Sequence, residues 1–237
     1  MGPRDSLIDS PKPSYQLPTS TSALGVNMKS MKPVIIVSLA ILSLLGAQTA
    51  LADLVINEID YDQPSTDTAE FVEIYNTGPE VVDLFEYRLE FWNGSSNTLY
   101  NAFSLLGTLA PGEFHVVCGS ALMVPNCDQD VSPDSNLIQN GAPDAVVLTK
   151  LTVIIDAVSY EGDVPGYTEG TGAGADTAGF FESINRFPDG VDTDDNSADF
   201  YLRCATPGEP NAPAGIPCED PVPVEGQAWG DIKALYR

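Results

Sequence analysis

Residues 70–76 read Glu-Phe-Val-Glu-Ile-Tyr-Asn, and their side chains alternate between two faces. In an extended chain Phe71, Glu73 and Tyr75 lie on one face, whereas Val72 and Ile74 lie on the other. A period of two residues is that of a β-strand and not that of a helix. The segment therefore predicts a β-strand with two different faces.

Similar short runs lie on both sides of this segment. We expect strands at 54–59, 70–76, 81–92, 98–105, 113–118, 144–149, 153–160 and 180–187. Asn93-Gly94 is a turn signal, and the runs at 144–149 and 153–160 are spaced as a hairpin. About seven to nine short strands without a sustained helical period predict an all-β sandwich, with long acidic loops such as 119–143 and 161–179.

The N-terminus is typical of an export signal. Residues 28–32 are a short basic start, 33–45 are almost wholly apolar, and 50–52 (Ala-Leu-Ala) form a cleavage site before Asp53. The apolar run is too short for a membrane span of about 20 residues. We expect 1–52 to be an N-terminal extension and signal peptide, and the protein to be secreted or at the cell surface, without stable membrane insertion after cleavage.

The chain is strongly acidic, with 10 basic and 34 acidic residues and a net charge of −24. Four of the basic and only two of the acidic residues precede residue 53, so the remainder carries −26. Such a surface repels nucleic acid and anionic lipid, and it suits divalent cations or basic partners. Solubility alone is the other interpretation.

The four cysteines predict disulfides, because an even number in an exported chain is typical of an oxidising compartment. Proximity favours Cys118–Cys127 and Cys204–Cys218, although the two other pairings stay open. Each bond would close a loop of about ten to fifteen residues, worth roughly 2.5–3 kcal/mol in the chain-entropy model. The spacings are too wide for zinc knuckles, and the only histidine is His115.

The stretch 186–211 holds the densest set of oxygen ligands in the chain. A hard cation such as Ca²⁺ takes six to eight oxygens. The candidate ligands are Asp189, Asp192, Asp194, Asn196 and Asp199. The loop is not an EF-hand: counted from Asp192, position 6 is Ser197 rather than Gly and position 12 is Arg203 rather than Glu. The alternative is that these side chains accept hydrogen bonds from the backbone of a turn-rich loop.

A second acidic set borders the first strand connection and is a weaker metal candidate: Asp60, Asp62, Asp67 and Glu70.

His115 lies inside an expected strand without the partners of a nucleophilic triad. With 32 acidic residues after residue 52, some carboxylates will lie close together by chance. No phosphate-binding glycine motif is present, so we predict no organic cofactor.

Several pieces in fixed order resemble one family, the lamin tail domain in its bacterial secreted form. They are Asn57-Glu58-Ile59, the segment 70–76, Leu109-Ala110-Pro111-Gly112-Glu113, residues 139–146, residues 155–160, Arg186-Phe187-Pro188-Asp189-Gly190 and Thr206-Pro207-Gly208-Glu209-Pro210-Asn211. The resemblance covers about 53–212 and implies an immunoglobulin-like β-sandwich. It also implies an interaction or scaffold module, for which no catalytic residues carry over.

After this domain, residues 213–237 form a Pro-rich linker and a short C-terminal tail, Trp229-Gly230-Asp231-Ile232-Lys233-Ala234-Leu235-Tyr236-Arg237. From the whole chain we predict a non-enzymatic exported module that contacts protein or a surface polymer at the cell envelope or outside the cell. The alternative is a secreted metal-dependent hydrolase that uses clustered carboxylates. The sequence leaves the oligomeric state open.

Overall fold

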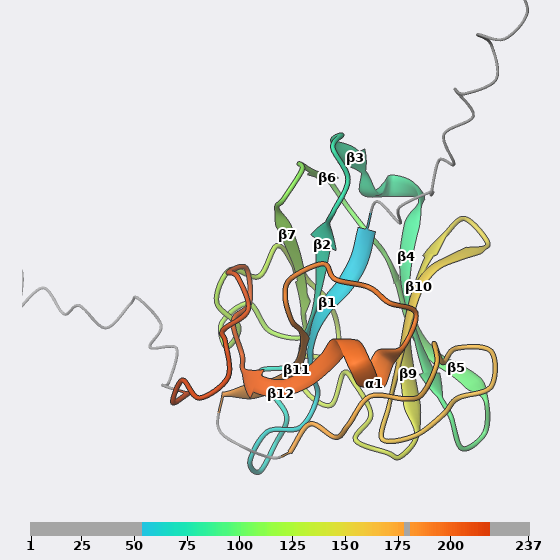
Figure 1. Ribbon diagram of the computed structural model, residues 1–237, viewed down its shortest axis with the longest axis vertical. Helices are drawn as coiled ribbons and strands as arrows, with labels where there is room; N and C mark the ends of the chain where they lie inside the picture. Colours follow the sequence, from blue (N-terminus) through green and yellow to red (C-terminus); the bar gives the residue numbers. More distant parts are fainter. Residues whose placement is uncertain (1–53, 178–180, 219–237) are drawn as a thin grey trace, which may run out of the picture. The chain divides into compact units, whose positions relative to one another are not determined.

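The computed structural model of the protein describes residues 54–177 and 181–218. Twelve strands, one 3₁₀ turn and one short helix make up this part of the chain (Figure 1). In chain order they are β1 (Leu54–Asp60), β2 (Phe71–Asn76), β3 (Val82–Asp83), η1 (Leu84–Glu86), β4 (Tyr87–Asn93), β5 (Thr98–Ser104), β6 (Thr108–Leu109), β7 (Phe114–Cys118), β8 (Gln129–Asp130), β9 (Asp144–Lys150), β10 (Val153–Tyr160), β11 (Glu182–Arg186), α1 (Asn196–Asp199) and β12 (Phe200–Cys204).

The strands form two main sheets, which confirms the predicted sandwich. One sheet has the order β12-β11-β1-β2-β7-β8, and the other has the order β10-β9-β4-β5. Neighbours are antiparallel except β7 and β8. Figure 1 shows β7, β2 and β1 in one layer and β4, β9 and β10 in the other. The predicted hairpin of 144–149 and 153–160 is present as β9 and β10.

The main core lies between the two sheets. Val72 and Ile74 of β2 are fully buried in it, together with residues of the second sheet such as Leu89, Val146 and Val158. The two different faces predicted from the alternation at 70–76 are present, and Val72 and Ile74 lie on the face that packs between the sheets. Burying a large aliphatic side chain contributes about 1.5–3 kcal/mol, so this face accounts for much of the stability.

The opposite face of the six-stranded sheet is also covered, which alternation alone does not predict. Phe71 packs there in a second cluster with Val116, Cys118 and Val124, and Ala205 packs against it. The covering segments are the loop after β7 and the chain after β12. As a result both faces of β1 and β2 are largely buried, including acidic side chains on the outer face.

Two expected boundaries differ in the structure. The strand expected at 81–92 is divided into β3, η1 and β4, because Asp83 caps the turn by accepting a hydrogen bond from the Phe85 N–H at 3.1 Å. In addition, β12 follows the acidic loop and pairs with β11, although no strand is predicted there from the sequence. Its burial pattern does not alternate, so it lacks the period-two signal.

The structure contains the two disulfides that sequence proximity favours, Cys118–Cys127 and Cys204–Cys218. The predicted signal peptide and the tail 219–237 lie outside the described residues. Across 54–177 and 181–218, no helix has the length and apolar character of a membrane span.

Candidate functional site

The acidic loop after β11 is organised around one buried cation, Arg186. Its side chain is fully buried, and its Nη2 lies 3.2 Å from Asp156 on β10. Its Nη1 lies 3.0 Å from Asp199 and 3.2 Å from Asp192. The Nε donates to the Ile56 carbonyl at 3.1 Å. This guanidinium therefore ties the loop to both β1 and β10, because its fixed fork of donors serves several acceptors at once.

The predicted calcium ligands do not converge on one point. Asp192 and Asp199 reach Arg186, but Asp189 accepts hydrogen bonds from the Asn57 amide at 3.0 Å and from the Asn211 N–H at 3.1 Å.

The other two predicted ligands also have different roles. The Asn196 side chain accepts from the Ser159 N–H at 3.0 Å and donates to the Ala157 carbonyl at 2.9 Å. Asp194 is exposed, and its own N–H donates to the Asp192 carboxylate at 3.1 Å. The contacts favour the second interpretation of the loop, in which its oxygens accept hydrogen bonds from protein donors, and Ca²⁺ binding stays a prediction.

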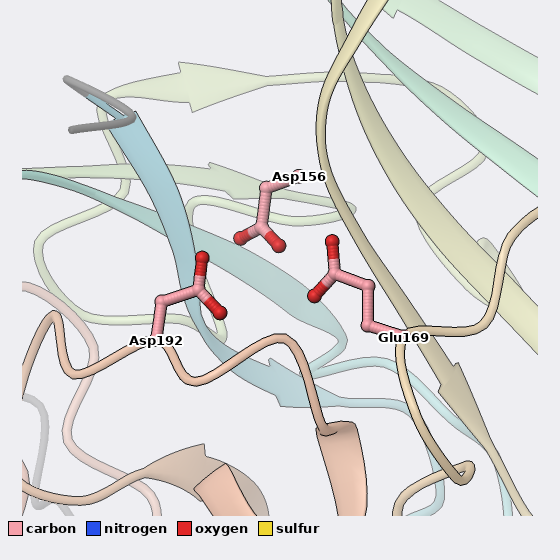
Figure 2. A group of neighbouring side chains, drawn as sticks. All are labelled: Asp156, Glu169 and Asp192. Atoms are coloured by element: carbon pink, nitrogen blue, oxygen red, sulfur yellow. The ribbon is translucent and has the colours of Figure 1, made fainter. Parts of the chain in front are cut away.

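A different group of carboxylates does come together here: Asp156, Glu169 and Asp192 (Figure 2). One oxygen from each lies within 4.8 Å of the others. Burial raises the pKa of Asp156 to about 6, although Arg186 opposes this effect. Burial, followed by the charges of Asp156 and Asp192, raises the pKa of Glu169 to about 8. Repulsion among the three is thus relieved by Arg186 and by bound protons.

Sequence reasoning missed Asp156 and Glu169. Asp156 is an isolated acid inside the apolar strand β10, and Glu169 lies in the loop that follows. A single acid within an apolar run signals a buried partner, and this signal could have directed attention to Asp156.

Further buried acids fasten the end of the domain to its first hairpin. Glu58 accepts hydrogen bonds from the Thr206 N–H at 2.9 Å and hydroxyl at 3.1 Å, and Glu73 accepts from the Gly208 N–H at 2.7 Å. Gly208 has a φ of +77°, and a Cβ there would lie 2.5 Å from Cβ of Asn126. Burial raises the pKa of Glu58 to about 7 and that of Glu73 to about 9. The motifs at 57–59, 70–76 and 206–211 are therefore parts of one buried network.

The members of the second acidic set accept hydrogen bonds from protein donors. Glu70 accepts hydrogen bonds from the N–H groups of Leu137 at 2.6 Å and Ile138 at 2.8 Å, so it fixes the loop 119–143. Asp67 accepts from the Gln63 N–H at 3.0 Å. Asp60 also lines a cavity, and the four residues do not form a metal centre.

This cavity, of about 320 Å³, is the most suggestive binding feature among the described residues. It lies where β1 ends and β2 begins, since Asp60 and Phe71 are paired across the two strands and both line it. Its other walls come from residues 122–125 and from the chain after β12, including Ala205 and Pro207. We call it the hairpin-end cavity.

Both disulfides support the walls of the hairpin-end cavity. Cys118–Cys127 closes the loop that carries residues 122–125, and Cys204–Cys218 anchors the strand end beside Ala205. The Asn126 amide donates to the Pro207 carbonyl at 3.0 Å and joins the two walls. The two disulfides therefore restrain these walls, and the sequence gives no direct signal for the cavity because its walls are far apart in the chain.

Taken together, the sheets, the core and the two disulfides define an immunoglobulin-like β-sandwich domain. Residues 47–162 match the model of the Lamin Tail Domain family, which confirms the resemblance over that part of the chain. A protein of the DUF4876 family from Bacteroides thetaiotaomicron has a solved structure with 14% identity and a TM-score of 0.45, covering 71% of this chain and 75% of that one. No curated protein matches the chain.

Proposed function

We propose that this protein is an exported, non-catalytic binding module that contacts another protein or a surface polymer at the cell envelope or outside the cell. The observation that carries the proposal is the hairpin-end cavity and its exposed apolar edge. Leu122 is 89% exposed and Met123 is 52% exposed, and both line the cavity. An apolar cavity bordered by exposed apolar side chains is typical of an interaction surface.

The family supports a binding role, because the Lamin Tail Domain is an immunoglobulin-like, non-catalytic domain. The two disulfides indicate an oxidising compartment, which supports export. A rigid sandwich with loops tied by disulfides also suits binding, because preorganised loops lose little entropy when a partner docks.

The alternative, a metal-dependent hydrolase, would need carboxylates that are free to hold a metal and its water. The Asp156 carboxylate accepts hydrogen bonds from the Ile56 N–H at 2.6 Å and from Arg186 at 3.2 Å. His115 is buried within β7, and burial lowers its pKa. These contacts favour a structural role for the group in Figure 2.

The test is capture of a partner from envelope extract by the purified, disulfide-bonded protein, followed by repetition with the purified partner. We expect Leu122→Asp and Met123→Asp to abolish capture. The matched control is Phe85→Asp, because Phe85 is 78% exposed but does not line the cavity. Equal capture by all variants would contradict the proposal. So would turnover of polysaccharides, phosphoesters or peptides that is lost when a single carboxylate is changed.

A further inference from the structure

The polar residues of the hairpin-end cavity specify its occupant more closely, an inference that rests on the proposed function. We propose that the cavity binds a lysine side chain of a partner protein, with the aliphatic stem against the apolar walls and the ammonium group at Asp60. The partner is thus a basic polypeptide segment rather than a polymer without amines.

The walls match the stem of lysine. Phe71, Val124 and Pro125 line the cavity, and Leu122 and Met123 extend the apolar surface outward. A lysine side chain buries its methylene groups along apolar surface while its charged end seeks polar groups. At about 320 Å³ the cavity is at the lower end of the range of ligand sites, which suits one long side chain.

The acid in the wall supplies the acceptor. Asp60 is only 4% exposed, and the Gln63 side-chain amide donates a hydrogen bond to it. Burial raises the pKa of Asp60 well above its usual range, and the charges of Asp176, Glu58 and Glu70 raise it further. No Lys, Arg or His is among the residues that line the cavity. An ammonium group bound here would displace the proton from Asp60 and pair with its carboxylate, which relieves the unfavourable burial of an acid among other acids.

Asp176, whose charge acts on Asp60, has a buried carboxyl oxygen without a hydrogen-bond partner among the described residues. Its Oδ2 accepts hydrogen bonds from the Tyr61 N–H at 3.0 Å and from the Asp62 N–H at 3.2 Å, but its Oδ1 has no partner among the described residues. Asp176 is 2% exposed, and a buried oxygen without a hydrogen bond is unfavourable. A cation near Asp60 would stabilise this carboxyl as well.

Ammonium fits this site better than the other cations. Guanidinium binds a carboxylate best through both oxygens at once, but Asp60 Oδ1 already accepts a hydrogen bond from Gln63, whereas the compact ammonium of lysine needs only one oxygen. A calcium ion needs six to eight oxygens. Within the described residues, the carboxylates that converge closely enough to hold a metal are Asp156, Glu169 and Asp192, which do not line the cavity. The net charge of −24 also favours encounter with basic partners.

The test uses three small probes on the full, disulfide-bonded protein: the Nα-acetyl methylamides of lysine, of norleucine as its neutral analogue and of arginine. Binding is followed by the NMR shifts of the backbone amides of Ala69, Phe71 and Val124, which lie in the cavity wall. We expect saturable shifts with the lysine probe and about tenfold weaker binding of the other two, the value of one charge-assisted hydrogen bond.

Asp60→Asn should remove the preference for the lysine probe and leave norleucine binding unchanged. The matched control is Asp134→Asn, because Asp134 is exposed and outside the cavity. If Asp60→Asn does not fold, the ratio of lysine to norleucine binding in the unaltered protein still decides the matter. Lys233→Ala is titrated in parallel, because Lys233 is in the tail of the same chain.

Equal binding of lysine and norleucine would overturn the ammonium assignment but leave the apolar docking surface of the proposed function intact. If the lysine probe binds only to the Lys233→Ala variant, Lys233 of the chain's own tail occupies the cavity in the unaltered protein. That result would overturn the assignment of the cavity to a partner protein. No shift with any probe in either protein would overturn the inference, and partner capture by the Leu122 and Met123 variants would then decide the proposed function separately.

Discussion

The acidic loop at 186–199 and the hairpin-end cavity both contain buried carboxyls, but they differ in how those charges are compensated. In the loop, Arg186 contacts Asp156, Asp192 and Asp199. In the cavity, Asp60 lies beside other acids and no basic residue lines the wall. The density of acidic residues thus identifies the loop, whereas the lack of a compensating cation identifies the cavity. For a binding site, the second property is the more informative one.

The largest effect is expected from removing Arg186, the buried cation of the acidic loop. Arg186→Met leaves Asp156 and Asp199 buried without their partner, and loss of one member of a buried pair costs about 3–5 kcal/mol. We expect the free energy of unfolding, measured in urea, to fall by that amount. Arg88→Met is the control, because the Arg88 side chain is 45% exposed and its contact with Glu90 is 3.7 Å. This exposed pair should contribute less than about 1 kcal/mol. A similar small loss for Arg186→Met would show that the loop does not depend on it.

The cavity should depend instead on its disulfides. Replacing Cys118 and Cys127 together with Ala should lower the free energy of unfolding by roughly 2.5–3 kcal/mol and weaken capture of the partner, since the loop that carries Leu122 is then untied. The double variant of Cys204 and Cys218 should lose a similar amount of stability. Urea unfolding and the capture assay measure the two effects. If the variant without Cys118 and Cys127 captures the partner as well as the unaltered protein, this disulfide is not needed for the binding surface.

Much of the sandwich could be predicted from the sequence, because its signals are local. The period of two residues at 70–76 predicted a strand with two different faces, and the spacing of the runs at 144–149 and 153–160 predicted the hairpin of β9 and β10. Cysteine proximity gave both disulfides. Each of these features depends on residues that are near one another in the chain.

The sites could not be predicted in the same way, because their contacts are long-range. Asp156 and Arg186 are 30 residues apart and meet across different sheets. The walls of the cavity join Asp60, the loop around Leu122 and the chain at Ala205. The predicted ligands at Asp189 and Asn196 failed to converge because each satisfies backbone or amide donors of a different neighbour.

A smaller effect concerns the buried network of Glu58 and Glu73. Their pKa values, raised to about 7 and about 9, exceed the ordinary 4.5 of the unfolded chain. The folded protein therefore holds protons that the unfolded chain releases. The free energy of unfolding should be highest near about pH 4.5 and fall as the pH rises toward about 9.

Glu73→Gln cannot ionise and should reduce this fall by at least about 2 kcal/mol. Urea unfolding at several pH values measures the slope. Glu80→Gln is the control, because Glu80 is exposed and should leave the slope unchanged. An identical slope for Glu73→Gln would mean that Glu73 is ionised in the folded protein and that the network resembles the compensated loop.

The smallest expected effect is that of calcium on the loop. Because Arg186 already provides the positive charge and the predicted ligands point to different partners, we expect no change in melting temperature between excess Ca²⁺ and EGTA. A cation present at 100 times its Kd would add about 2.7 kcal/mol, which is well within the sensitivity of thermal unfolding. A clear increase that disappears in Asp194→Asn would place Ca²⁺ on the exposed side of the loop. In that case Arg186 would neutralise only the buried carboxyls of the loop, and the difference from the hairpin-end cavity would be limited to those buried groups.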